Sequence, residues 1–168
     1  AFPMTFEPSL SDEVVYIGKY RMTDVVIDEG HSIGQLLLSP TRTYAPVMKE
    51  LLAEHFDKIH GLVHCSGGGQ TKCMKFVPDG VRVVKDNLFE APYIFEIIKD
   101  CSGSDWREMM QVFNMGCRLE IFCSPADAQI MIDTAAKYGI AARVTGRVEA
   151  AAGKSLQINY AGETIIFD

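Results

Sequence analysis

The chain has 168 residues, enough for one domain of ordinary size that buries roughly 70% of the surface exposed by its unfolded form. Lysine and arginine together number 16 against 22 aspartates and glutamates, which gives a formal net charge of −6, and 48% of the residues are hydrophobic. This composition is typical of a globular protein, and its acidic balance argues against a non-specific nucleic-acid binder while leaving room for a local cationic pocket.

The chain shows no sign of export, of a membrane span or of a metal site. No apolar run reaches the roughly 18 residues of a membrane helix, and the start lacks the basic and apolar regions of a signal peptide. The first dozen residues carry Pro3 and Pro8 without a periodic pattern, and we interpret residues 1–30 as a linker or extension before one domain over 31–168. An odd number of cysteines in apolar segments, with no Cys-x-x-Cys pair, favours small buried hydrophobes in a reducing cytoplasm: Cys65, Cys73, Cys101, Cys117 and Cys123.

The first half of the chain predicts two strands and one helix. Residues 14–22 have the composition of a strand, and the acidic residues 24–32 are typical of a turn-rich connection. The run 46–56 has helical periodicity, with a proline in its first turn. Residues 61–65 are apolar and bounded by glycine, which predicts a central strand. The buried face expected for the helix consists of Val47, Met48, Leu51, Leu52 and Phe56.

The second half predicts further strands and helices, interspersed along the chain. The helix over 124–139 has the clearest signals, with Ser124 as N-cap, Pro125 at the first position and Gly139 at its end. Because strands and helices are interspersed without strict alternation, we expect an α+β fold, a three-layer α/β/α domain with a mixed β-sheet and helices on both faces. The remaining predicted elements are strands at 81–85, 117–123 and 141–150, helices at 91–100 and 105–113, and a hairpin over 155–168 turning near Gly162; the stripe predicted for the helix over 124–139 is Ala128, Met131, Ala135 and Ala136.

A run of glycines follows the strand predicted at 61–65. Ser66, Gly67, Gly68 and Gly69 expose successive backbone N–H groups without side chains that would keep an anion away. If a helix begins there, its positive dipole end faces the same place, so the segment predicts a phosphate cradle. The spacing matches neither the dinucleotide fingerprint nor the P-loop, and a tight turn that needs positive φ angles is the alternative.

Three further positions carry chemistry on weaker patterns. His64 near the end of the predicted strand is either a hydrogen-bonded core residue or a catalytic group. Arg42 lies on a stiff segment after Pro40, where its guanidinium suits either a phosphate clamp or a surface ion pair. Asn114 and Gly116 close the helix predicted at 105–113, and a simple helix C-cap explains them equally well.

Taken in order, the segments "SPTRTY", "GLVHCSGGG", "VFNMG" and "TGRVE" resemble the carboxyl-terminal domain of the aminoimidazole ribonucleotide (AIR) synthetase family, also called phosphoribosylformylglycinamidine cyclo-ligases. The resemblance runs from about residue 32 to residue 148. It implies a two-domain, cytoplasmic, homodimeric ligase of purine biosynthesis, in which a preceding domain supplies most of the ATP and Mg²⁺ site. The family reaction converts formylglycinamidine ribonucleotide and ATP to aminoimidazole ribonucleotide, ADP and phosphate.

The resemblance also assigns site residues. It implies that His64 is catalytic, because it matches the histidine before the triple glycine, and that this domain alone is inactive. This sequence departs from the family pattern at Arg118, where a second glycine is usual. An arginine there forbids the same close approach of the backbone to a ligand. The residues matching the substrate- or phosphate-binding segments are Thr41, Arg42, Ser66, Gly67, Gly68, Gly69, Asn114 and Gly116, and no metal ligand is among them.

Other interpretations stay open. The chain could be a stand-alone module that binds a phosphorylated metabolite, another ATP-dependent member of the superfamily such as formylglycinamidine ribonucleotide synthetase, or a purely structural domain. The last of these predicts that replacing Arg42 or Gly68 by alanine changes no ligand affinity.

Overall fold

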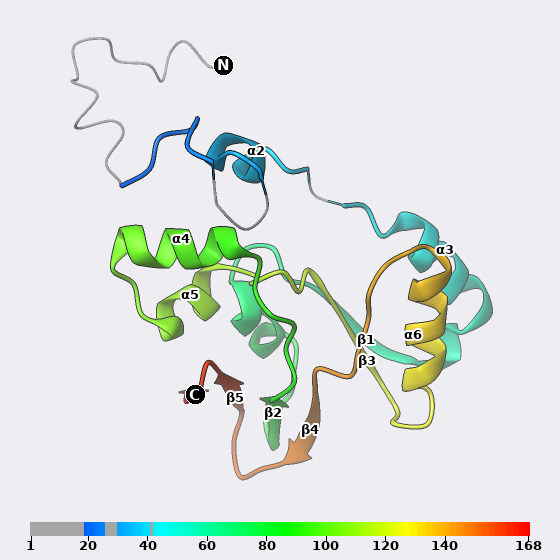
Figure 1. The fold of residues 1–168 in the computed structure, drawn as a ribbon. Coiled ribbons are helices and arrows are strands. Elements are labelled where there is room, and N and C mark those ends of the chain that lie inside the picture. The colour runs from blue at the N-terminus through cyan, green and yellow to red at the C-terminus, as the bar shows by residue number, and fades with distance from the viewer. Residues whose placement is uncertain (1–18, 26–29, 41) are drawn as a thin grey trace, which may run out of the picture.

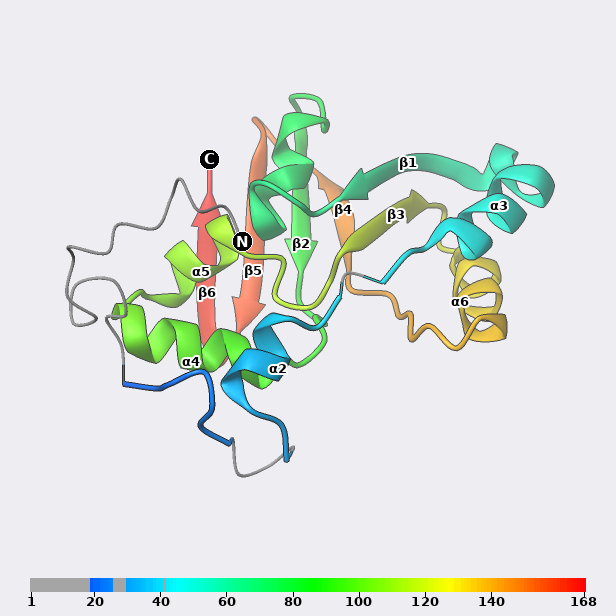
Figure 2. The same cartoon turned by 90° about the horizontal axis from the view of Figure 1, so that it is seen from above.

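The computed structural model describes residues 19–25, 30–40 and 42–168. Its strands form two sheets (Figures 1 and 2). The larger sheet is mixed: β2 (Val81–Lys85) pairs antiparallel with β4 (Gly146–Ala150) and parallel with β5 (Ser155–Tyr160), which pairs antiparallel with β6 (Glu163–Phe167). The smaller sheet is an antiparallel pair.

The smaller sheet extends away from the larger one toward two helices (Figure 2). It pairs β1 (Ile59–His64) with β3 (Leu119–Cys123), with a register shift between Ile59 and Gly61. The helices α3 (Ala45–Glu54) and α6 (Ala128–Lys137) pack on it, and the short 3-10 helix η2 (Phe56–Lys58) joins α3 to β1. The predicted strand at 61–65 is therefore present at β1, but it is not central in the main sheet.

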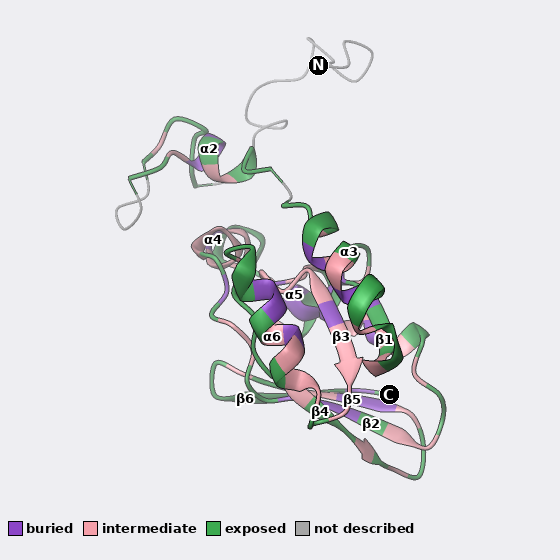
Figure 3. Cartoon of the chain, turned by 90° about the vertical axis from the view of Figure 1, so that its right-hand side faces the viewer, coloured by how far each residue is buried: buried purple, intermediate pink, exposed green. Residues whose placement is uncertain are grey.

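The other helices cover one face of the four-stranded sheet. They are α4 (Tyr93–Ser102), α5 (Trp106–Val112) and the 3-10 helix η3 (Gly69–Lys75), and α2 (Ile33–Leu37) contacts α4. Figure 3 shows that the buried positions gather where helices face strands. The core side chains on this face of the sheet are Val83, Leu156, Ile158, Ile165 and Phe167, packed against Cys73, Met109 and Met110.

The α+β class and the mixed sheet are confirmed, and the layers are arranged differently from a single sheet covered on both faces. The second face of the four-stranded sheet carries the exposed residues Arg82, Asn159 and Thr164, and Ile166 on it is 50% exposed. The reason is the alternation in β5 and β6, which places the apolar side chains of these strands on the other face, Ile166 excepted. The two groups of helices thus cover two different sheets.

The predicted helices are present with shifted edges. In α3, Val47 and Leu51 are buried, but Leu52 is exposed and Phe56 lies in η2, 70% exposed, because the helix ends at Glu54. α6 begins later than predicted because the Ser124 hydroxyl donates to the Asp127 carboxylate, 2.6 Å away, and does not cap the helix.

The ends of the other predicted elements also follow local chemistry. In α6, Thr134 is buried while Ala136 is exposed, and Gly139 adopts a φ of +67° directly after the helix, as predicted. The terminal hairpin turns at Ala161 and Gly162, whose φ angles of 50° and 80° suit a two-residue hairpin turn. Most of the strand predicted at 14–22 lies outside the described residues, and residues 19–22 form no strand.

No helix in the described ranges is long and apolar enough to cross a membrane.

Candidate functional site

The glycine run forms a tight turn between β1 and η3. Gly68 has a φ of +98° and caps η3, and the Gly69 N–H donates to the Ser66 carbonyl at 3.2 Å. Within the described part of the chain, the N–H groups of Gly67 and Gly68 donate to no protein acceptor. The helix that follows is a seven-residue 3-10 helix rather than an α-helix. The turn therefore leaves two adjacent backbone donors open to an anion, with little help from a helix dipole.

Gly69 has a packing role that is separate from any ligand. Its φ is +49°, and a Cβ built on it would lie 2.4 Å from the Phe113 carbonyl oxygen and 2.7 Å from that of Met110. A side chain at this position would therefore collide with the end of α5. Gly67 is different, because nothing lies within 4 Å of a Cβ built there. The tight-turn explanation thus accounts for Gly69, and it does not account for Gly67.

The segment after α5 forms a second turn beside the glycine run. The Cys117 N–H donates to the Asn114 carbonyl at 2.9 Å, and the Gly116 N–H donates to Asn114 Oδ1, also at 2.9 Å. α5 ends at Val112, so Asn114 and Gly116 belong to this turn and not to a helix C-cap. The buried Gln70 side chain donates to the Asn114 carbonyl at 2.6 Å, which joins the two turns.

The remaining predicted site residues are less closely connected. His64 ends β1 opposite Leu119 and is exposed, as is Ser66 next to the glycines. Arg42 is exposed before α3, and no hydrogen bond or ion pair with a described residue joins it to the glycine turn. Thr41 lies outside the described residues. The structure thus brings together the glycine run and the Asn114 turn, and it places Arg42 outside this hydrogen-bonded cluster.

A buried charged network lies behind the two turns. Lys85 at the end of β2 is 3% exposed, and its Nζ donates to the Gln70 carbonyl at 2.7 Å, to Gln70 Oε1 at 3.1 Å and to Glu120 on β3. Burial alone would lower the pKa of Lys85, but the charge of Glu120 and the hydrogen bond to it outweigh burial, so that the pKa is raised. Lys85 therefore stays an ammonium group and ties both turns to β3.

Sequence reasoning missed this network. Lys85 is the last residue of the predicted strand "VRVVK", and Glu120 is the acidic residue of the predicted strand "CRLEIFC". Glu120 alternates with Leu119 and Ile121, so the period of the strand sets it on the same face as Phe122. A charge at such a position is a signal that a partner is needed, although the sequence does not say which residue supplies it.

Buried thiols surround the same network. Burial raises the pKa of Cys65, Cys73 and Cys117, and the negative charge of Glu120 acts in the same direction on all three. These groups are therefore uncharged thiols at neutral pH, consistent with the expected role as small buried hydrophobes. The same expectation is wrong for Cys101, which is exposed.

We expect the free energy of unfolding to fall as the pH rises above about 9, the ordinary pKa of a cysteine thiol. The unfolded chain loses these protons first while the native state keeps them, so alkaline pH favours unfolding, by up to about 1.4 kcal/mol per pH unit for each thiol. Urea unfolding between neutral pH and pH 10 measures the slope. Cys73→Ala should make it shallower, and Cys101→Ala, at an exposed position, should not. Equal slopes in both variants would contradict the prediction.

Comparison with known proteins shows the family to which the chain is similar. A family model described as "AIR synthase related protein, C-terminal domain" matches residues 18–159. The chain is 32% identical over 139 residues to a phosphoribosylformylglycinamidine cyclo-ligase of Methanopyrus kandleri, covering 83% of this chain and 39% of that protein. It is 34% identical over 152 residues to one of Methanocaldococcus jannaschii, covering 90% and 42%. The chain thus spans about two fifths of the length of these curated relatives.

Proposed function

Because the chain belongs to the AIR synthase-related C-terminal domain family, we propose that it forms the carboxyl-terminal part of a phosphoribosylformylglycinamidine cyclo-ligase. The observation that supports this most is the family match over residues 18–159, together with cyclo-ligase relatives at 32% and 34% identity. In this proposal the full-length enzyme is a cytoplasmic homodimer that makes aminoimidazole ribonucleotide, ADP and phosphate from formylglycinamidine ribonucleotide and ATP.

The domain contributes phosphate contacts and a proton-transfer group to a shared active site. The open N–H groups of Gly67 and Gly68 fit a phosphate oxygen. The family resemblance assigns Thr41 and Arg42 to phosphate binding as well, and a guanidinium suits that role. ATP supplies the phosphoryl group that activates the formyl oxygen. As the family resemblance implies, the proposal assigns Mg²⁺ mainly to a domain that precedes this one in the full-length enzyme.

The direct test is an assay of the full-length protein that contains this chain. Release of ADP and formation of aminoimidazole ribonucleotide, both dependent on formylglycinamidine ribonucleotide, are expected. A pure, folded full-length protein that releases no ADP with this substrate would overturn the proposal.

His64 orients or protonates the reacting amide in this proposal, so His64→Ala is expected to lower kcat by about a hundredfold or more, the usual scale of general acid–base catalysis. The side chain is exposed at the end of β1, so the fold should tolerate the change. His60, an exposed histidine on the same strand, provides the matched control. His60→Ala should keep kcat within about twofold, because His60 has no assigned role in the reaction and a change at an exposed position has little effect on the stability of the fold. Equal losses of kcat in the two variants would contradict the role of His64.

A further inference from the structure

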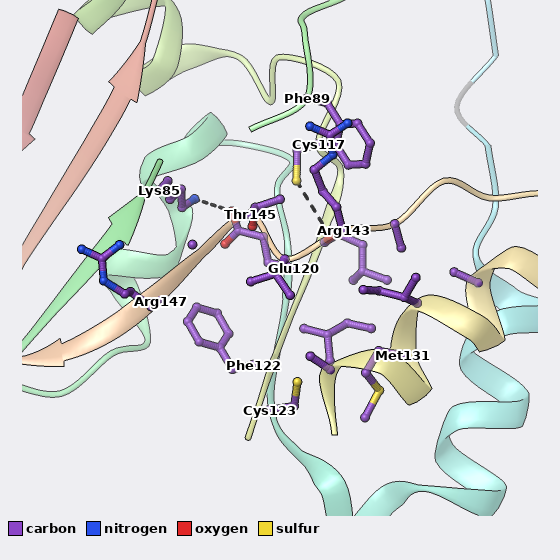
Figure 4. A pocket seen from close by; sticks show the side chains of 18 of the residues that line it. Lys85, Phe89, Cys117, Glu120, Phe122, Cys123, Met131, Arg143, Thr145 and Arg147 are labelled. Atoms are coloured by element: carbon purple, nitrogen blue, oxygen red, sulfur yellow. Dashed lines mark hydrogen bonds and ion pairs between the residues drawn. The ribbon is translucent and has the colours of Figure 1, made fainter. Parts of the chain in front are cut away.

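A cavity of about 560 Å³ lies along β3, beside α6 and the segment 140–148 that leads into β4 (Figure 4). Its walls are mainly apolar and include Phe89, Phe122 and Met131. Small-molecule sites commonly have volumes of about 300–1,000 Å³ and apolar walls with a few polar groups. The cavity therefore has the size and lining of a binding site, and its polar groups determine what it would bind.

Two buried charged groups belong to this lining, the ammonium of Lys85 and the carboxylate of Glu120. Glu120 is 8% exposed, and its Oε1 accepts from Lys85. Its Oε2 is buried and has no hydrogen-bond partner among the described residues. A buried carboxylate oxygen without a donor is costly, because it has lost its contacts with water and gained none from the protein. Glu120 therefore has an acceptor to offer to a ligand, and Figure 4 shows it among the lining side chains, with Lys85 beside it.

The charges near Glu120 determine which kind of hydrogen-bond donor on a ligand would suit its Oε2 atom. The Lys85 ammonium group already neutralises Glu120, and its three contacts are made to Glu120 and to two oxygens of Gln70. A second cation would leave an excess positive charge in a buried place, which is unfavourable. A neutral N–H group, such as an aromatic amine or an amide, satisfies Oε2 without adding charge.

Two arginines of the lining, Arg118 and Arg143, have no carboxylate partner in the described ranges, and Arg143 is the one that stacks on an aromatic ring. The guanidinium of Arg143 lies over the Phe89 ring, 4.2 Å from its centroid, and Figure 4 shows the two side chains together. A guanidinium stacked in this way still has N–H groups for a planar anion. Arg147 also lines the cavity, but it is already paired with Asp86 and Glu149.

We propose that this cavity binds a flat aromatic ring that carries a neutral amine or amide N–H group at one end and an acidic group at the other. The N–H group donates to Glu120 Oε2, the ring packs against Phe122 and the apolar wall, and the acidic group contacts Arg143. The site is distinct from the open N–H groups of Gly67 and Gly68, and the inference does not depend on the proposed ligase function.

Three probes of similar shape test the two polar contacts separately. 4-Aminobenzoate has both groups, benzoate lacks the donor and aniline lacks the acidic group. Calorimetric titration of the full-length protein should show 4-aminobenzoate binding about tenfold more tightly than either partial probe, the effect of one hydrogen bond to a charged group. No saturable binding of 4-aminobenzoate at millimolar concentrations, or equally tight binding of benzoate, would overturn the proposal.

Two arginine variants give a matched comparison at the same cavity. Arg143→Gln should lower the affinity for 4-aminobenzoate about tenfold, close to that of aniline, while Arg147→Gln should change it less than about twofold because that charge is already paired. Glu120→Gln should remove the preference of the protein for 4-aminobenzoate over benzoate. Should Glu120→Gln not fold, the ranking of the three probes on the wild type and the two arginine variants still decides the outcome. An equal effect of both arginine changes would contradict the assigned contact.

Discussion

Glu120→Leu is expected to lower the free energy of unfolding by about 3–5 kcal/mol, because it leaves the Lys85 charge buried without its partner. Lys85 is 3% exposed, and the contacts that would remain are two oxygens of Gln70, which carry no charge. A leucine side chain also offers no acceptor that could hold the Lys85 ammonium group in place. Urea unfolding of the single variant against the wild type measures the loss.

The double variant Lys85→Met, Glu120→Leu separates the charge from the packing. Replacing both partners by apolar residues removes the uncompensated charge, so it should recover most of the stability lost in the single variant. The pair of Lys137 and Glu50 at the surface, with side chains 59% and 15% exposed, is the control, and Glu50→Leu should have a much smaller effect because solvent screens the Lys137 charge. A double variant as unstable as Glu120→Leu would show that the network stabilises the fold through hydrogen bonds to Gln70 rather than through the ion pair.

Sequence patterns predict best those elements of the fold whose conformation depends only on residues close together in the chain. The hairpin turn near Gly162 follows from a glycine between two strand-like segments, and β2 follows from a short apolar run. The start of α6 was predicted less well, because Ser124 had two possible partners nearby and the Asp127 side chain took the hydroxyl in place of a backbone N–H.

The arrangement of these elements could not be predicted in the same way, because it depends on contacts between distant residues. Nothing local distinguishes the pairing of β1 with β3 from a place in the main sheet, and Lys85 meets Glu120 across 35 positions of sequence. The same limit holds for the candidate site. The glycine run and the Asn114 turn meet through Gln70, a residue with no motif of its own, while no hydrogen bond or ion pair with a described residue joins Arg42 to them.

Gly69→Ala is expected to lower the free energy of unfolding by about 3 kcal/mol. About 1–2 kcal/mol comes from holding a residue with a Cβ in the left-handed region, where Gly69 has a φ of +49°. A further contribution of about 1–3 kcal/mol comes from the collision of that Cβ with the Phe113 carbonyl oxygen, 2.4 Å away. Backbone atoms at the end of α5 cannot move aside as a flexible side chain would, so the loss should appear in urea unfolding without any ligand present.

Gly67→Ala makes the matched comparison, because its Cβ meets nothing within 4 Å. Its effect on unfolding should stay within about 0.5 kcal/mol, the usual range for an open surface position. In the full-length enzyme the same methyl group would stand next to two open N–H groups, so a raised KM with unchanged stability is expected if they hold a phosphate. A stable Gly67→Ala enzyme with an unchanged KM would leave packing as the whole reason for the glycine run. A raised KM would mean that Gly69 shapes the turn and Gly67 keeps it open to the ligand, two different demands on neighbouring residues of one type.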